Sequence, residues 1–227
     1  MVDRPIIFSA PMVHALLAGR KPQTRRMIKI RGHRSFREFG PSDTKGYDWH
    51  FRDAEARWHD LRHAELLARL RWQAGDRLWA KETWSPDPRG AMGYGSVYRA
   101  DGDHVRPDAG RWRSPIHMPR WASRLTLTVT DVRVQRLQEI TDADAEAEGA
   151  TGRPGGYNSP DWCMDWSRIG QHSRIAGRPL TQSDIALGGP IWAYASYWNE
   201  LHGPGAWDAN PWIVALTSTV EKRNIDA

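Results

Sequence analysis

Residues 123–137, SRLTLTVTDVRVQRL, alternate apolar and polar side chains along most of their length. Leu125, Leu127 and Val129 are separated by threonines, which is the period of a β-strand that is buried on one face only. This stretch therefore predicts a long, half-buried strand, and we expect the fold to be built around it.

Shorter patterns on both sides of this stretch predict the remaining elements. Strands are expected at 4–9, 25–30, 74–86, 96–100 and 210–222, and helices at 10–19, 51–73, 140–150 and 190–203. Residues 31–50 and 87–115 are expected to be mainly loop, and 151–190 a long polar excursion rich in Gly, Pro and Ser. Because strands dominate, we expect an α+β fold, a small closed or partly closed β-barrel with flanking helices. We treat residues 1–227 as one domain with insertions at about 31–73 and 151–190.

The composition is that of a globular protein with a moderate excess of positive charge. Hydrophobic residues make up 40% and charged residues 26% of the chain, which excludes a disordered chain. The net charge of +5 fits a nucleotide or nucleic acid, although many basic proteins bind neither. Thirteen tryptophans are far more than usual, and we assign most of them to packing and the rest to stacking on bases.

The chain has features of a cytoplasmic protein. Cys163 is the single cysteine, so no intramolecular disulfide is possible, and its acidic neighbours Asp161 and Asp165 argue against a reactive thiol. No apolar run approaches the roughly 20 residues that span a bilayer. The N-terminal residues lack a signal-peptide pattern, so we expect no membrane partner.

Residues 17–30, LAGRKPQTRRMIKI, allow two interpretations. Their two lysines and three arginines are typical of a loop that binds a phosphate backbone. Lys21 and Thr24 are three residues apart, so both can also point to one side and act in catalysis. A neutral lysine can take the proton of a threonine hydroxyl if burial or nearby cations lower its pKa.

Four blocks of this sequence resemble the ASCH superfamily, which has a PUA-like β-barrel fold. AGRKPQTRR (18–26) resembles its GxKxxTxR signature, and GDRLWAKETW (75–84) its second block. The stretch 114–149, which contains the long strand and ends in an acidic helix, resembles the third block, and WDANPWIVAL (207–216) the closing one. Such chains are frequent in phages and prophages. The blocks cover 65 of the 227 residues and leave both insertions without a counterpart.

The resemblance implies a catalytic trio of Lys21, Thr24 and Glu148. In small bacterial ASCH amidohydrolases, the corresponding residues remove the acetyl group from N4-acetylcytidine. Glu146 is the alternative carboxylate, because a slip in register would exchange it with Glu148. The glutamate would then carry a proton to the leaving amine or orient the lysine.

Further residues are candidates for binding the substrate, each with a structural alternative. We assign Arg20, Arg25, Arg26, Trp79, Glu82, Arg120 and Trp121 to this group. On a continuous strand, Glu82 and Trp84 share one face and Trp79 faces the other. Asn210 and Trp212 are assigned a structural role. His59 and His63 are four residues apart on the expected helix but lack a third ligand, so we predict no metal and no cofactor.

Three functions remain open at this stage. The first is a hydrolase that removes an acyl group from a modified cytidine or a related base, whether free or in a polymer. The second is a non-catalytic RNA- or DNA-binding module, and the third is a ribonuclease. As a nucleic-acid partner of this chain, RNA is favoured over DNA. Affinity that falls steeply with salt would indicate a backbone binder.

Overall fold

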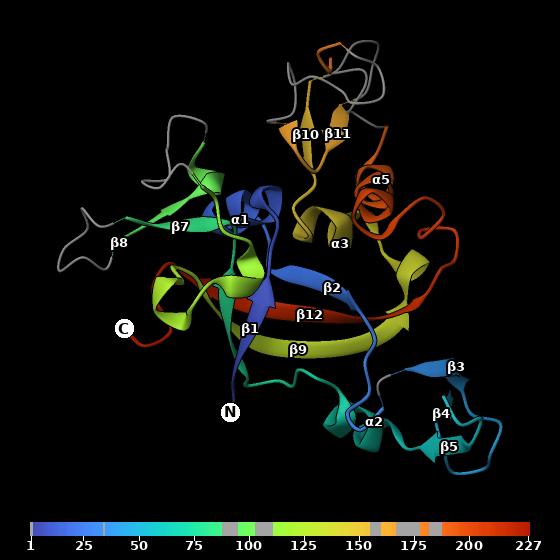
Figure 1. Cartoon of the computed structure of the whole chain (residues 1–227). Coiled ribbons are helices and arrows are strands. Elements are labelled where there is room, and N and C mark those ends of the chain that lie inside the picture. The colour runs from blue at the N-terminus through green and yellow to red at the C-terminus, as the bar shows by residue number, and fades with distance from the viewer. Residues whose placement is uncertain are drawn as a thin grey trace.

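The main sheet of this protein has five strands in the spatial order β1–β6–β9–β12–β2 (Figure 1). The computed structural model describes residues 2–33, 35–87, 95–102, 111–154, 160–166, 178–181 and 188–227. β1 and β6 are parallel, whereas the other neighbours are antiparallel. The strands are β1 Asp3–Ile7, β2 Gln23–Met27, β6 Arg77–Lys81, β9 Thr126–Arg136 and β12 Trp212–Glu221.

β9 is the long strand that the alternating stretch predicts. Leu125, Leu127 and Val129 are at most 1% exposed, so the apolar side of the pattern faces the core. β9 pairs with β12 along its length, with one irregularity between Thr217 and Ser218. The prediction of a strand near the C-terminus is confirmed by β12.

The expected mixed α+β class is confirmed, but the described strands form no closed barrel. The edge strands β1 and β2 do not pair with each other in the described part of the chain. A side chain bridges them instead, since Arg26 Nη2 on β2 donates to the carbonyl oxygen of Ile7 on β1 at 2.8 Å. The sheet is therefore curved and open, and its two edges approach each other at Arg26.

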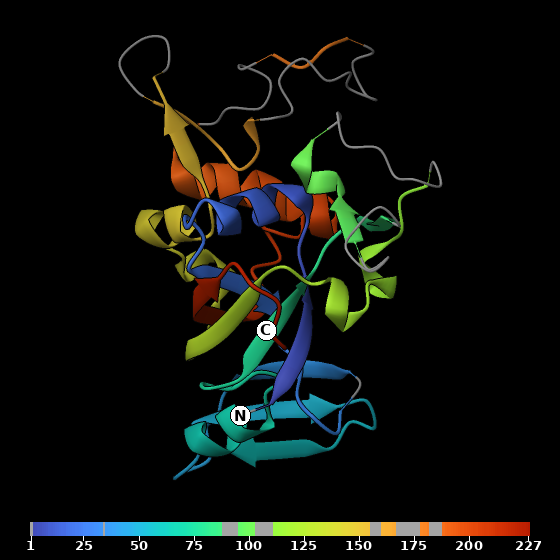
Figure 2. The ribbon, with the colours of Figure 1, turned by 90° about the vertical axis from the view of Figure 1, so that its left-hand side faces the viewer.

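Three helices lie on one side of the sheet in both ribbon views (Figures 1 and 2). They are α1 Ala10–Leu17, α3 Asp142–Ala147 and α5 Pro190–His202. The predicted helices at 10–19, 140–150 and 190–203 are thus confirmed, with shorter bounds. Thr141 caps α3 as expected, because its hydroxyl accepts a hydrogen bond from the backbone N–H of Asp144 at 3.1 Å.

A three-stranded module occupies the first insertion on the opposite side of the sheet (Figures 1 and 2). Its strands are β3 Phe36–Pro41, β4 Trp49–Asp53 and β5 Trp58–Leu61, and they are followed by the short helix α2 His63–Arg69. The predictions of a loop at 31–50 and a helix over 51–73 are therefore wrong, apart from 63–69. Leu61, Leu66 and Leu70 of this segment pack into the core.

The helix prediction fails at 51–62 because a turn and cross-strand packing outweigh local helix propensity. Asp53 accepts hydrogen bonds from the backbone N–H and the Nε of Arg57, which closes a tight β4–β5 turn. Ala56 in that turn has a φ of +66°, which a helix cannot contain. Phe51 is fully buried on β4 and stacks on His59 of β5, at 4.6 Å between ring centroids.

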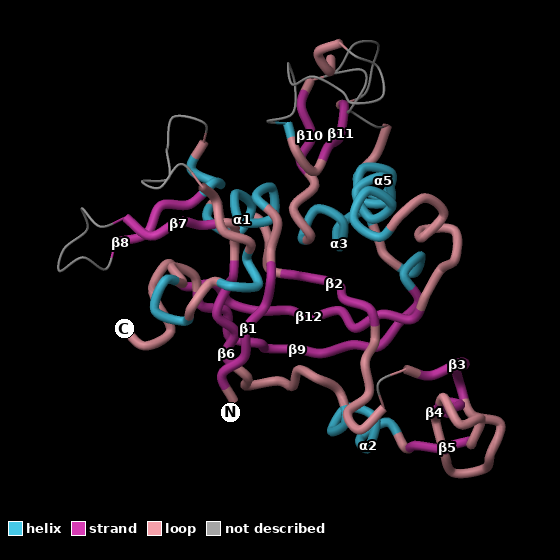
Figure 3. Tube along the Cα trace, in the orientation of Figure 1, coloured by secondary structure: helices cyan, strands magenta, loops and turns pink. Residues whose placement is uncertain are grey.

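Two hairpins and several single-turn 3-10 helices complete the described structure (Figure 3). The hairpins are β7 Trp84–Asp87 with β8 Gly95–Tyr98, and β10 Thr151–Arg153 with β11 Asp161–Cys163; the 3-10 helices are η2 Arg99–Asp101, η3 Pro115–His117, η4 Arg120–Ala122 and η5 Leu137–Glu139. The expected strand 74–86 is broken at Glu82 and Thr83 into β6 and β7, so Glu82 and Trp84 do not share a strand face. Most of the 151–190 excursion lies outside the described residues. None of the described helices is long and apolar enough to span a membrane.

Candidate functional site

The ends of α3 and β2 bring the predicted catalytic residues towards one another. Glu148 is the last residue of the α3 turn, and Gly149 follows it with a φ of +111°. A Cβ at position 149 would lie 2.9 Å from the Cβ of Ala15, so α1 and α3 can pack this closely only around glycine. Thr24 lies on β2, opposite Leu216 of β12.

Lys21 and Glu148 form a buried ion pair. Lys21 Nζ lies 2.5 Å from Glu148 Oε2 and also donates to the backbone carbonyl of Glu148 at 2.8 Å. Both side chains are fully enclosed. Glu146 is exposed instead, so Glu148 is the carboxylate that meets the lysine.

Arg25 extends this pair into a cluster of two cations and two carboxylates. Its Nη1 donates to Glu148 Oε1 at 3.2 Å, and its Nη2 lies 3.0 Å from Asp144 Oδ2. The guanidinium group is fully buried. We call Lys21, Arg25, Asp144 and Glu148 the buried cluster. Arg25, a predicted substrate ligand, is thereby occupied within the protein.

Burial shifts the pKa of Lys21 and of a tyrosine beside the buried cluster. It lowers the pKa of Lys21, although the negative charge and hydrogen bond of Glu148 act in the opposite direction. The pKa of the nearby Tyr194 is raised well above its ordinary value, first by burial and then by the charge of Glu148. Lys21 therefore gives up its proton more readily than an exposed lysine, and the acceptor lies 2.5 Å away.

Thr24 is buried, and the hydrogen-bond partner of its hydroxyl group lies outside the buried cluster. Its Oγ1 accepts a hydrogen bond from Arg26 Nη1 at 3.0 Å. In the part of the chain that the structure describes, no hydrogen bond joins this hydroxyl to Lys21 or Glu148. The structure thus joins two of the three predicted residues directly and places Thr24 one residue from Arg25 on the same strand.

A basic cleft lies beside Thr24, with Arg26 as the shared residue. It has a volume of about 440 Å³ and contains the cations Arg26, Lys29, Arg71 and Lys81. Its other lining residues are His202 and the mainly apolar set Pro5, Ile6, Ile7, Met27, Trp72 and Ile116. No carboxylate lines it among the described residues, so the cleft suits an anion with an apolar or aromatic part.

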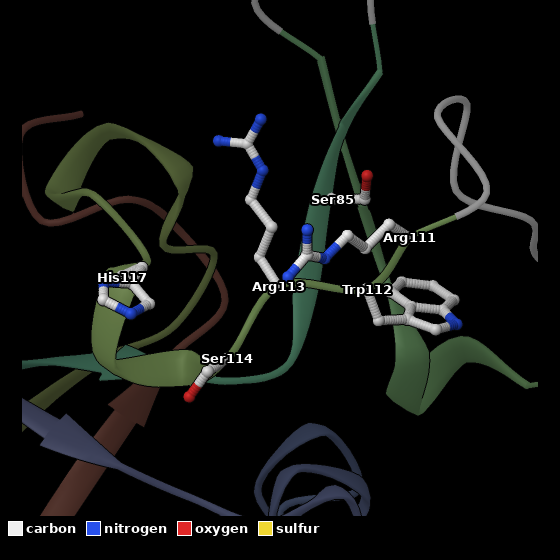
Figure 4. A pocket seen from close by; sticks show the side chains of 6 residues that line it. All are labelled: Ser85, Arg111, Trp112, Arg113, Ser114 and His117. Atoms are coloured by element: carbon white, nitrogen blue, oxygen red, sulfur yellow. The ribbon is translucent and has the colours of Figure 1, made fainter.

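A second basic pocket borders η3 (Figure 4). It has a volume of about 700 Å³ and is lined by Ser85, Arg111, Trp112, Arg113, Ser114 and His117. Figure 4 shows the Arg111 side chain turned back towards Arg113, with the indole of Trp112 pointing away from both guanidinium groups. The two hollows are neighbours, because Ile116 lines the basic cleft and the next residue, His117, lines this pocket.

Two further predicted ligands, Arg20 and Glu82, are not among the residues that line the basic cleft. Arg20 lines a different hollow, beside β10 and β11, and donates to the carbonyl of Gly149. Glu82 is buried in a two-pronged ion pair with Arg124, with both N–O distances 2.9 Å. Burial raises the pKa of Glu82, while Arg124 acts against this rise.

Trp79, Arg120 and Trp121 have mainly structural contacts. The Trp79 ring lies under the ammonium group of Lys81, at 5.3 Å, at the edge of the basic cleft. Arg120 binds the carboxylates of Asp3 and Asp226 and ties the C-terminal residues to β1. Trp121 packs edge-to-face on Trp84 and remains 48% exposed.

Sequence reasoning missed Lys29, Arg71 and Lys81 as cleft residues and Asp144 as part of the buried cluster. The cleft cations come from separate segments, so no motif joins them. Asp144 is the third residue of α3, where a helix-capping role already accounts for it.

No protein-family model, curated protein or solved structure matches this chain.

Proposed function

We propose that this chain is an ASCH-type protein with a PUA-like fold that hydrolyses the acyl amide of a modified cytosine or a related base. The observation that supports this proposal most strongly is the enclosed ion pair of Lys21 and Glu148, next to a strand that carries Thr24. A fully buried lysine with a lowered pKa is costly to maintain, and such groups concentrate at catalytic sites. We place this activity in the cytoplasm.

In the proposed reaction, Lys21 in its neutral form takes the proton of the Thr24 hydroxyl. The Thr24 oxygen forms a bond to the acyl carbon, and the bond between that carbon and the exocyclic nitrogen breaks. The proton passes through Lys21 and Glu148 to the leaving amine. Water then attacks the Thr24 ester, which releases the carboxylic acid and restores the hydroxyl.

Arg26 supports the nucleophile in this scheme. Its hydrogen bond to Thr24 Oγ1 stabilises negative charge that develops on that oxygen, and it leaves the hydroxyl proton for the base. Because the same side chain lines the basic cleft, a substrate bound there lies next to Thr24. The cleft cations favour a substrate that carries phosphate, with RNA ahead of DNA.

The test is incubation of the full chain with N4-acetylated cytosine compounds, as the nucleoside, the 5′-monophosphate and a short RNA, followed by chromatography. Wild-type protein is expected to convert at least one of these compounds to acetate and the deacetylated cytosine compound. The Thr24→Ala variant should lose this activity by orders of magnitude. Thr130→Ala is the matched control, since Thr130 is an exposed threonine on β9. No release from any compound would contradict the proposal.

A second candidate is a non-catalytic module that binds RNA through the basic cleft. The absence of lining carboxylates among the described residues favours it. It predicts tight RNA binding that weakens steeply with salt and no chemical change in the acylated base. The ribonuclease alternative predicts that the RNA chain itself is cut in the same incubation.

A further inference from the structure

Three side chains that can bind a metal converge in the inserted module, far in sequence from the buried cluster. His33 precedes β3, Asp53 ends β4 and His59 lies within β5. One potential ligand atom from each lies within 4.8 Å of the others. Asp53 is fully buried, while the two histidines are partly exposed. Two histidines and one carboxylate are a ligand set that zinc uses in proteins.

The contacts of this group fix the side chains for a metal. His59 Nε2 and Asp53 Oδ2 are joined by a hydrogen bond of 2.8 Å. The His59 ring stacks on Phe51, and the His33 ring meets both rings edge-on, at 4.7 Å from Phe51 and 5.0 Å from His59. Arg57 holds the carboxylate from its backbone N–H and its Nε, each at 2.9 Å.

We propose that His33, Asp53 and His59 bind one divalent transition-metal ion, with zinc the best fit. The metal replaces the proton between His59 and Asp53, which is released to solvent, and a water molecule takes the fourth position. Tetrahedral zinc with bonds of about 2.0–2.1 Å needs its ligand atoms about 3.3 Å apart. The present separations, from 2.8 Å up to at most 4.8 Å, bracket that value, so small side-chain shifts suffice.

The site lies between two parts of the module. It joins the segment that leaves β2 to the β4–β5 hairpin, which the helix prediction did not anticipate. Arg57 keeps its hydrogen bonds to the Asp53 carboxylate and so orients this ligand. Bound zinc therefore stabilises the module against unfolding, because the assembled ligands exist only in the folded state.

The test is a calorimetric zinc titration of the full chain after chelator treatment, together with a metal count after dialysis. The wild type is expected to bind one zinc ion per chain, and zinc should raise its melting temperature. His33→Ala and His59→Ala should each weaken binding by about 100-fold or more and remove the thermal shift. Circular dichroism of both variants without zinc checks that they fold.

His63→Ala is the matched control. His63 lies in the same module and is exposed, but its hydrogen-bond partner is the indole N–H of Trp49. This variant should bind zinc as the wild type does. The proposal is overturned if the wild type binds no zinc, if either His33→Ala or His59→Ala binds it with unchanged affinity, or if His63→Ala loses it.

Discussion

Replacing Glu148 by glutamine should destabilise the protein more than replacing its partner Lys21 by methionine. Glutamine keeps the shape of the side chain but removes the charge that Lys21 and Arg25 share. Among the described residues Lys21 then has no acidic partner, because its side-chain hydrogen bonds go to the carboxylate and the backbone carbonyl of Glu148. In Lys21→Met, by contrast, Glu148 still has Arg25 at 3.2 Å.

The expected magnitudes follow from this asymmetry. Leaving a buried charge without its partner costs about 3–5 kcal/mol, which is the loss we expect for Glu148→Gln. Losing one charged hydrogen bond while the other ion remains paired costs about 1.5–3 kcal/mol, which applies to Lys21→Met. The double variant should be less destabilised than the sum of both, by about 1–3 kcal/mol, because removing Lys21 removes the unpaired charge.

Urea denaturation followed by circular dichroism measures these differences. With an m value of roughly 2.5 kcal/mol/M, a loss of about 4 kcal/mol moves the unfolding midpoint by roughly 1.5 M. Glu146→Gln is the matched control, since Glu146 is exposed, and it should leave the midpoint almost unchanged. Equal midpoints for Glu148→Gln and the wild type would refute the reasoning about the buried cluster.

Three further outcomes are expected. Replacing Lys29 and Lys81 together by glutamine should weaken RNA binding about 10-fold or more at low salt and flatten its salt dependence, measured by fluorescence anisotropy; parallel salt slopes would argue against the basic cleft. The pKa of Asp3 is lowered from 3.8 to about 2, chiefly by a hydrogen bond from an arginine of β6, so its share of the stability is present above pH 4 and is lost as the pH falls towards 2. Asp3→Asn should therefore make the acid-induced fall in unfolding free energy shallower, and an unchanged fall would count against this pair. Leu66→Ala should lower the free energy of unfolding by about 2–5 kcal/mol, because Leu66 is fully buried. Leu67→Ala should lower it by less, because Leu67 is only half-buried. Similar losses for both variants in urea denaturation would contradict the observed docking of α2.

The elements that depend on local chemistry could be predicted from the sequence. The period of two in 123–137 gives β9, because a strand with one buried face needs that alternation. Thr141 with Asp144 gives the start of α3, because the cap is made within four residues. Such signals survive in any tertiary context that leaves the local backbone unchanged.

The β4–β5 hairpin of the inserted module could not be predicted, because its sequence is compatible both with a helix and with a hairpin. Ala54, Glu55 and Ala56 are good helix formers, and only pairing of Trp49–Asp53 with Trp58–Leu61 makes them a turn. That pairing also places His59 beside Asp53 and His33. A helix would have placed it beside His63, the partner considered from spacing alone.

The pairing of Lys21 with Glu148 was predicted through resemblance and not through spacing. Lys21 and Glu148 are 127 residues apart, and no local pattern connects them. Arg25 is indistinguishable in sequence from its neighbour Arg26, yet one is enclosed with Glu148 and the other lines the cleft. The side on which each falls depends on the pairing of β2 with β12, which brings Arg25 opposite Ala215 and Arg26 opposite Val214.

The most direct test of the central claim compares wild type and Lys21→Arg in single-turnover reactions with an N4-acetylated cytosine substrate. Arginine keeps the positive charge, but it does not give up its proton at any accessible pH, so it cannot act as the base for Thr24. The account predicts acetate release by the wild type, a loss of at least several hundredfold in the variant, and substrate affinity that is largely retained. Wild-type rates from Lys21→Arg would contradict catalysis by Lys21 and leave residues 17–30 as a binding segment.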